Sequence, residues 1–214
     1  MNTSARSALI VIDMEHSFLD PDSAHCIAMA MDTVPACVRA VETARAKGIP
    51  VVFVTRNYRP DGSDVECTRY AAWKAGGRGM APGSYGAEAP EGLRPLPGDY
   101  ALVKPRWSAF FQTELDLILR RLGVRTVILT GTTTPNCVRT TCYDANALDY
   151  NVVVLTDCTS SQTQAIQDAN LADMERMGAV LMDSEAFQSY GPDTVPDLAA
   201  GIRADIFRER NGCE

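Results

Sequence analysis

The sequence predicts an α/β fold: a three-layer α/β/α sandwich around a six-stranded, mostly parallel sheet. Short apolar runs of strand length alternate with segments whose apolar residues recur at helical spacing. Strands that alternate with helices favour a parallel sheet covered on both faces, with right-handed crossovers. The 214 residues contain no repeat and no linker-like stretch, so we expect one domain spanning residues 1–214.

The six expected strands are almost entirely apolar, as is typical of strands buried on both faces of a sheet. They lie at 8–12, 49–54, 100–103, 127–129, 152–155 and 179–182. Helical spacing is seen at 34–44, 113–122, 135–148, 166–177 and 202–207. Glycines at 48, 123 and 178 are placed to end three of these helices.

Composition disfavours several classes of partner. The net charge is −7 and no basic patch is visible, which disfavours nucleic acid and anionic membranes. The apolar runs are far shorter than the roughly 20 residues that span a bilayer, and the N-terminus shows no signal-peptide pattern. Seven scattered cysteines without a C-x-x-C pair indicate reduced thiols and a cytoplasmic location. With only two histidines, we expect no metal and no cofactor.

Three polar residues follow three of the apolar strands: Asp13, Lys104 and Cys137. Parallel strands place their carboxyl ends on one edge of the sheet, where open α/β sheets bind ligands. Each residue alone has an ordinary explanation: a turn-capping aspartate, a solvated lysine, or a small buried thiol. Their convergence favours a functional site.

The stretch around Cys137 predicts a strand, a tight turn and a helix. Thr134 suits the N-cap and Pro135 the first helical position, which places Cys137 in the first helical turn. Free N–H groups and the helix dipole at that end lower the pKa of a thiol and can hold an oxyanion.

Between residues 56 and 99 the sequence shows neither the strand nor the helix pattern of apolar residues, and Gly and Pro recur. A loop of this length is usually functional or mobile, so we expect a lid or an oligomer contact, partly helical at 65–74. Tyr58, Trp73 and Tyr85 are candidates for pocket walls or for interface aromatics. We expect substrate specificity to depend on this segment.

Three motifs carry a family resemblance: residues 9–14 with Phe18, residues 104–110, and residues 131–140. In this order and spacing they resemble the isochorismatase-like cysteine hydrolase superfamily. That superfamily includes nicotinamidases, N-carbamoylsarcosine amidase, ureidoacrylate and biuret amidohydrolases, and isochorismatase. The match covers roughly residues 8–185 and implies a Rossmann-like isochorismatase fold, commonly assembled as a homodimer or homotetramer.

The resemblance implies a catalytic triad of Asp13, Lys104 and Cys137. It also implies a cis peptide bond at Thr132–Thr133, with an oxyanion hole formed by the N–H groups of Thr133 and Cys137. Substrate contacts are expected from Phe18, Tyr58, Arg106, Phe111 and Thr132. We expect Arg106 to bind a substrate carboxylate, with a surface ion pair as the alternative; for Phe18 the alternative is the core.

Two departures from the family pattern bear on function. Nicotinamidases carry an aspartate and several histidines after the second strand, whereas residues 55–61 here contain no histidine, so no metal is expected. Isochorismatases that cleave an ether typically lack the nucleophilic cysteine, so Cys137 favours cleavage of a C–N bond. The predicted function is hydrolysis of a small amide, ureido or carbamoyl compound through a thioester. The alternatives are isochorismatase-type ether hydrolysis and a non-catalytic relative that senses redox state or binds a ligand.

Overall fold

The computed structural model describes residues 6–210 and shows one six-stranded sheet in the order β3-β2-β1-β4-β5-β6. Every pair of neighbouring strands is parallel, which confirms the predicted α/β class. The strands are β1 (Ser7–Ile12), β2 (Val51–Thr55), β3 (Tyr100–Val103), β4 (Thr126–Thr132), β5 (Asn151–Ser160) and β6 (Val180–Met182). The strand order, which the sequence left open, places β1 and β4 at the centre.

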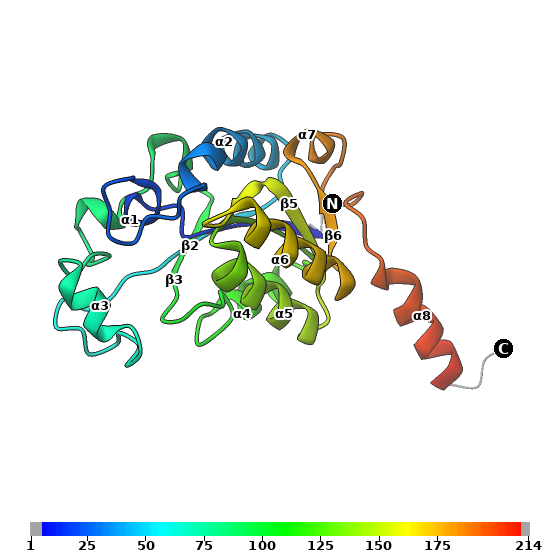
Figure 1. Ribbon diagram of the computed structural model, residues 1–214. Helices are drawn as coiled ribbons and strands as arrows, with labels where there is room; N and C mark the ends of the chain where they lie inside the picture. The colour runs from blue at the N-terminus through cyan, green and yellow to red at the C-terminus, as the bar shows by residue number, and fades with distance from the viewer. Residues whose placement is uncertain (1–5, 211–214) are drawn as a thin grey trace.

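Helices cover both faces of the sheet (Figure 1). One face carries α2 (Ala30–Ala46) and α7 (Ser184–Phe187), and the other carries α4 (Leu115–Arg121), α5 (Arg139–Ala147) and α6 (Gln164–Arg176). Shorter elements are α1 (His16–Leu19), α3 (Tyr70–Ala75), η1 (Tyr85–Ala87), η2 (Glu91–Leu93) and η3 (Thr134–Val138). Across residues 6–210, each helix is too short or too polar to cross a membrane.

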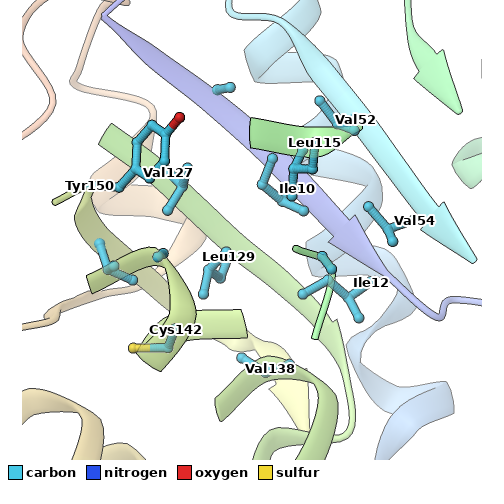
Figure 2. Close-up of a cluster of buried hydrophobic side chains, with 14 of the residues drawn as sticks. Ile10, Ile12, Val52, Val54, Leu115, Val127, Leu129, Val138, Cys142 and Tyr150 are labelled. Atoms are coloured by element: carbon cyan, nitrogen blue, oxygen red, sulfur yellow. The ribbon is translucent and has the colours of Figure 1, made fainter. Parts of the chain in front are cut away.

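The continuous apolar sequence of β1 follows from burial on both faces. Ile10 and Ile12 pack into the cluster on the α4–α5 side, which Figure 2 shows, whereas Leu9 and Val11 pack on the α2 side. Burying one such side chain contributes about 1.5–3 kcal/mol. The central strands are therefore held firmly, and the residues at their carboxyl ends are fixed in space.

Several elements differ from their predicted extent, β5 and the C-terminal helix among them. β5 runs on to Ser160, beyond the apolar core of the strand, and brings a backbone carbonyl beside the end of β4. The C-terminal helix forms as α8 (Ala199–Arg210) and extends away from the sheet (Figure 1). Its apolar side chains Ile202, Ile206 and Phe207 remain exposed, so this helix adds little to the described core.

The segment from 56 to 99 folds against its own chain. It contains α3, η1 and η2 and buries a separate apolar cluster of Tyr58, Val65, Trp73 and Met80, with Phe18 beside it. In Figure 1, α3 lies beyond the body of the sheet. The predicted lid or oligomer role stays a prediction, but part of the segment lines the cavity described below.

Gly131 of β4 pairs with Ile12 of β1. Its φ is +107°, and a Cβ there would lie 1.9 Å from the carbonyl oxygen of Ile12. Gly178, with a φ of +98°, has nothing within 4 Å of its Cβ position. Both glycines have a positive φ that would strain any other residue, but only at Gly131 would an added Cβ also collide with the backbone.

We expect Gly131→Ala to lower the free energy of unfolding by about 3 kcal/mol or more, because the collision adds to the strain at positive φ. Gly178→Ala, the matched control, should cost only about 1–2 kcal/mol. Urea unfolding of both variants measures the difference. Equal losses would show that the contact with Ile12 is unimportant.

Candidate active site

The side chains of Asp13, Lys104 and Cys137 meet at the carboxyl edge of the sheet. Lys104 Nζ lies 2.7 Å from Asp13 Oδ2 and 3.5 Å from Cys137 Sγ. The exposed fractions of the three residues are only 1%, 0% and 6%. The sheet brings them together because each follows the end of a parallel strand: β1, β3 and β4 respectively.

Backbone hydrogen bonds continue the sheet as far as two of these residues. The Asp13 N–H donates to Val54 O at 2.9 Å, and the Lys104 N–H donates to Thr55 O at 2.9 Å. Asp13 then turns the chain with a φ of +51°, a left-handed conformation that aspartate tolerates better than most residues. Both charged side chains are thus anchored to the ends of rigid strands.

The turn before Cys137 is held by Ser160, the last residue of β5. Its carbonyl oxygen accepts hydrogen bonds from Thr133 Oγ1 at 3.0 Å and Thr134 Oγ1 at 2.9 Å, and its own hydroxyl donates to Thr132 Oγ1 at 2.9 Å. The peptide bond between Thr132 and Thr133 is cis, at the position where the sequence led us to expect one.

The predicted helix cap is wrong in detail. The Thr134 hydroxyl donates to Ser160 instead of capping a helix, and Thr134–Val138 forms a single π-helical turn ahead of α5. Cys137 lies within this turn, and its carbonyl oxygen accepts a hydrogen bond from Thr141 Oγ1 at 2.7 Å. The thiol is still carried by the first turn of a helical segment.

The expected low pKa of the Cys137 thiol is also wrong for the resting structure. Burial raises this pKa to about 11; Lys104 lowers it, but Asp13 adds to the rise. The dominant cause is loss of hydration, which penalises the thiolate. Cys137 is therefore a thiol at neutral pH.

Glu15 is a second buried carboxyl group, close enough to Asp13 and Lys104 for their charges to act on it. Burial raises the pKa of Glu15 to about 9, with a smaller contribution from Asp13, so this carboxyl is protonated at neutral pH. Its Oε2 accepts the N–H of Arg56 at 3.0 Å. The Arg56 guanidinium pairs with Glu66 and donates from Nε to Tyr58 Oη at 2.8 Å. Arg56 and Glu66 thus balance each other's charge.

A cavity of about 340 Å³ opens beside Cys137. It is lined by Phe18, Ala24, His25, Cys26, Ile27, Arg56, Tyr58, Arg69, Ala72, Trp73, Met80, Thr132, Thr133, Pro135, Asn136, Cys137 and Gln162. Three of the expected substrate contacts are therefore placed at the cavity: Phe18, Tyr58 and Thr132.

Two expected substrate contacts lie elsewhere. The Arg106 guanidinium donates from Nη1 to the carbonyl oxygens of Asp64 and Pro105, at 2.8 and 2.6 Å, and does not line the cavity. Phe111 is 47% exposed and is also absent from the cavity wall. Pro105 turns the chain after Lys104, so proximity in sequence did not carry Arg106 to the same side.

Sequence reasoning missed two cationic residues of the wall, Arg56 and Arg69. Arg56 directly follows β2, the same kind of position that singled out Asp13 and Lys104, so this signal was available. Arg69 lies in the 56–99 segment just before α3, and no local pattern shows which way that loop folds.

Comparison with known proteins identifies the family. A family model described as the isochorismatase domain matches residues 7–186. The chain belongs to the isochorismatase family.

Individual relatives agree with this assignment. A protein of Arabidopsis thaliana named a probable inactive nicotinamidase is 41% identical over 80% of the chain and 89% of its own length. The ureidoacrylate amidohydrolase RutB of Variovorax paradoxus is 32% identical over 88% of the chain and 82% of its own length. The crystal structure of an isochorismatase family protein from Desulfovibrio vulgaris matches with a TM-score of 0.83 and 43% identity, over 86% of the chain and 97% of that structure.

Within residues 6–210, no group of three or more His, Cys, Asp and Glu side chains is placed to hold a metal ion. Around the end of β2, the side chains near the cavity are instead the cation Arg56 and the phenol Tyr58.

Protonated Glu15 predicts a pH-dependent stability. Its pKa is about 9 in the folded chain and 4.5 in the reference state, so the folded protein binds one more proton between these values. The contribution of this proton to the free energy of unfolding is fully present below about pH 4.5. It falls as the pH rises toward 9, by at most about 1.4 kcal/mol per pH unit.

We expect Glu15→Gln, which stays neutral, to remove this part of the alkaline decline in unfolding free energy. Urea unfolding at pH 5, 7 and 9 measures it. The exposed Glu91→Gln serves as control and should decline as the wild type does. A Glu15→Gln decline as steep as that of the wild type would contradict a proton held by Glu15.

Proposed function

We propose that this chain is a cysteine-dependent amidohydrolase that cleaves a C–N bond of a small amide, ureido or carbamoyl compound through a thioester. The observation that carries the proposal is the position of Lys104 Nζ, within reach of both the Asp13 carboxylate and the Cys137 sulfur. This arrangement lies beside a cavity large enough for a small molecule.

In the first half-reaction the Cys137 sulfur attacks the substrate carbonyl carbon while Asp13 accepts the thiol proton. Because the resting pKa of Cys137 is raised, proton transfer accompanies the attack instead of preceding it. The Lys104 ammonium stays beside both groups and stabilises the negative charge that moves between them. Asp13 then gives its proton to the leaving nitrogen as the C–N bond breaks.

In the second half-reaction a water molecule attacks the thioester carbonyl. Asp13 takes a proton from this water and passes it to the sulfur as the C–S bond breaks, which releases the carboxylic acid and restores the Cys137 thiol. In both steps the N–H groups of Thr133 and Cys137 are the proposed donors to the oxyanion. The thiol divides one difficult substitution into two easier ones.

The relatives bear on the choice between functions. RutB is named an ureidoacrylate amidohydrolase, which supports C–N cleavage. The Arabidopsis relative is named a probable inactive nicotinamidase, so a redox-sensing or ligand-binding role is the outcome that a test has to distinguish. Ether hydrolysis needs no thiol and leaves Cys137 without a chemical role.

We expect Cys137→Ala to lose at least about 10⁴-fold in ammonia release from a panel of amides, ureas and carbamoyl amino acids, because the covalent route is removed. The unfolding midpoint should change little. Ammonia assay and intact-mass detection of an acyl adduct on the wild type are the measurements. Iodoacetamide should block the wild type.

Cys67→Ala is the matched control, since Cys67 is exposed and free, and this variant should keep wild-type turnover. Turnover retained by Cys137→Ala would reject the thioester route. Peroxide-dependent loss of the Cys137 thiol, without ammonia from any compound, would point to the sensor instead.

A further inference from the structure

Thr141, in the first turn of α5, makes two hydrogen bonds with one hydroxyl group. Its Oγ1 donates to the carbonyl oxygen of Cys137 at 2.7 Å and accepts the N–H of Ala109 at 3.0 Å. A hydroxyl has one proton to donate and two lone pairs, so both bonds can form at the same time. Thr141 and Ala109 are both fully buried, which shields these bonds from water.

These two bonds connect the segments that carry the sulfur and the ammonium group. Cys137 lies in the π-helical turn ahead of α5. Ala109 belongs to the irregular segment 104–114, which begins at Lys104 and joins β3 to α4. The two segments also meet directly, where Lys104 Nζ lies 3.5 Å from Cys137 Sγ. The Thr141 hydroxyl is thus a second connection between the same two segments.

The spacing between the sulfur and the ammonium group depends on how these segments are held together. The segment 104–114 contains no helix or strand, so its position is not set by a regular backbone ladder. Misplacing a reacting group by about 1 Å can cost on the order of 100-fold in rate. A buried hydroxyl that fixes both segments therefore bears on the reactivity of Cys137, although Thr141 does not line the cavity.

The neighbouring Thr140 makes only part of this arrangement. Its Oγ1 donates to the carbonyl oxygens of Asn136 at 2.7 Å and Cys137 at 3.4 Å, and its side chain is only half-buried. A threonine hydroxyl that bonds back to its own helical turn is common in helices. The bond from the N–H of Ala109 is what distinguishes Thr141, so the two threonines allow a matched comparison.

We propose that Thr141 is a positioning residue of the reaction: its hydroxyl holds the Cys137 turn and the Lys104 segment at the spacing that keeps the sulfur beside the ammonium group and the Asp13 carboxylate. This inference rests on the proposed function, which needs these three groups together. The alternative is that Thr141 only fills its place in the core. Loss of the hydroxyl would then leave the reactivity of Cys137 unchanged, or raise it by opening the thiol to water.

The first measurement needs no substrate. The Cys137 sulfur displaces iodide from iodoacetamide as the thiol gives up its proton, and peptide mass spectrometry follows this cysteine alone at neutral pH. Thr141→Val keeps the branched shape of the side chain and removes the hydroxyl. We expect it to slow the alkylation of Cys137 by about 10- to 100-fold, because the sulfur loses its place beside Asp13 and Lys104. Thr141→Ser, which keeps the hydroxyl, should react nearly as fast as the wild type.

The second measurement uses an amide that the wild type hydrolyses. The kcat of Thr141→Val should fall by about 10- to 100-fold while KM changes by less than about 3-fold, because Thr141 does not line the cavity. Thr140→Val is the matched control and should keep wild-type alkylation and turnover. Urea unfolding checks that each variant is folded, and Thr141→Ala carries the same expectation if Thr141→Val does not fold.

Three results would overturn the inference. Alkylation of Cys137 that is unchanged or faster in Thr141→Val would show that this hydroxyl does not hold the sulfur in its reactive place. Thr141→Ser as slow as Thr141→Val would assign the loss to side-chain shape, and an equally slow Thr140→Val would assign it to a general loosening of the helix. If no amide is hydrolysed, the proposed function fails, yet the alkylation rates still decide whether Thr141 positions Cys137.

Discussion

The arrangement depends on one buried ammonium group. Lys104 is fully buried, and its Nζ lies 2.7 Å from Asp13 and 3.5 Å from the Cys137 sulfur. A buried charge without a partner costs several kcal/mol, so the strands that end at Asp13 and Lys104 have to keep this pair in contact. The thiol is then held beside a carboxylate and a cation at once, which is the geometry that the proposed acyl transfer requires.

The neighbouring buried charged groups do not compete with the Asp13–Lys104 ion pair. Glu15 is protonated, because burial raises its pKa to about 9, and it does not compete with Asp13 for the lysine. Arg56 and Glu66 form a separate buried pair. The Cys137 thiol therefore lies beside the Asp13–Lys104 pair, and its raised pKa of about 11 keeps it protonated at neutral pH.

The long segment between β2 and β3 supplies much of the cavity wall. The sheet supplies Asp13, Lys104 and the turn of Cys137, whereas this segment supplies Arg69 and the aromatic wall. The residues at the sheet edge and the residues of the cavity wall thus come from separate parts of the chain. The apolar cluster inside this segment packs against Phe18, which follows β1.

The sequence by itself determined the α/β class, the six strands and the identity of the three residues at the sheet edge, because a parallel strand needs an apolar run and its carboxyl end has one location. Tertiary structure decided the strand order, since apolar runs do not encode which strands pair. It also raised the pKa of Cys137, because burial depends on atoms from many segments. It turned Arg106 away and brought Arg69 to the cavity, since the path of an irregular loop follows from packing that no local period records.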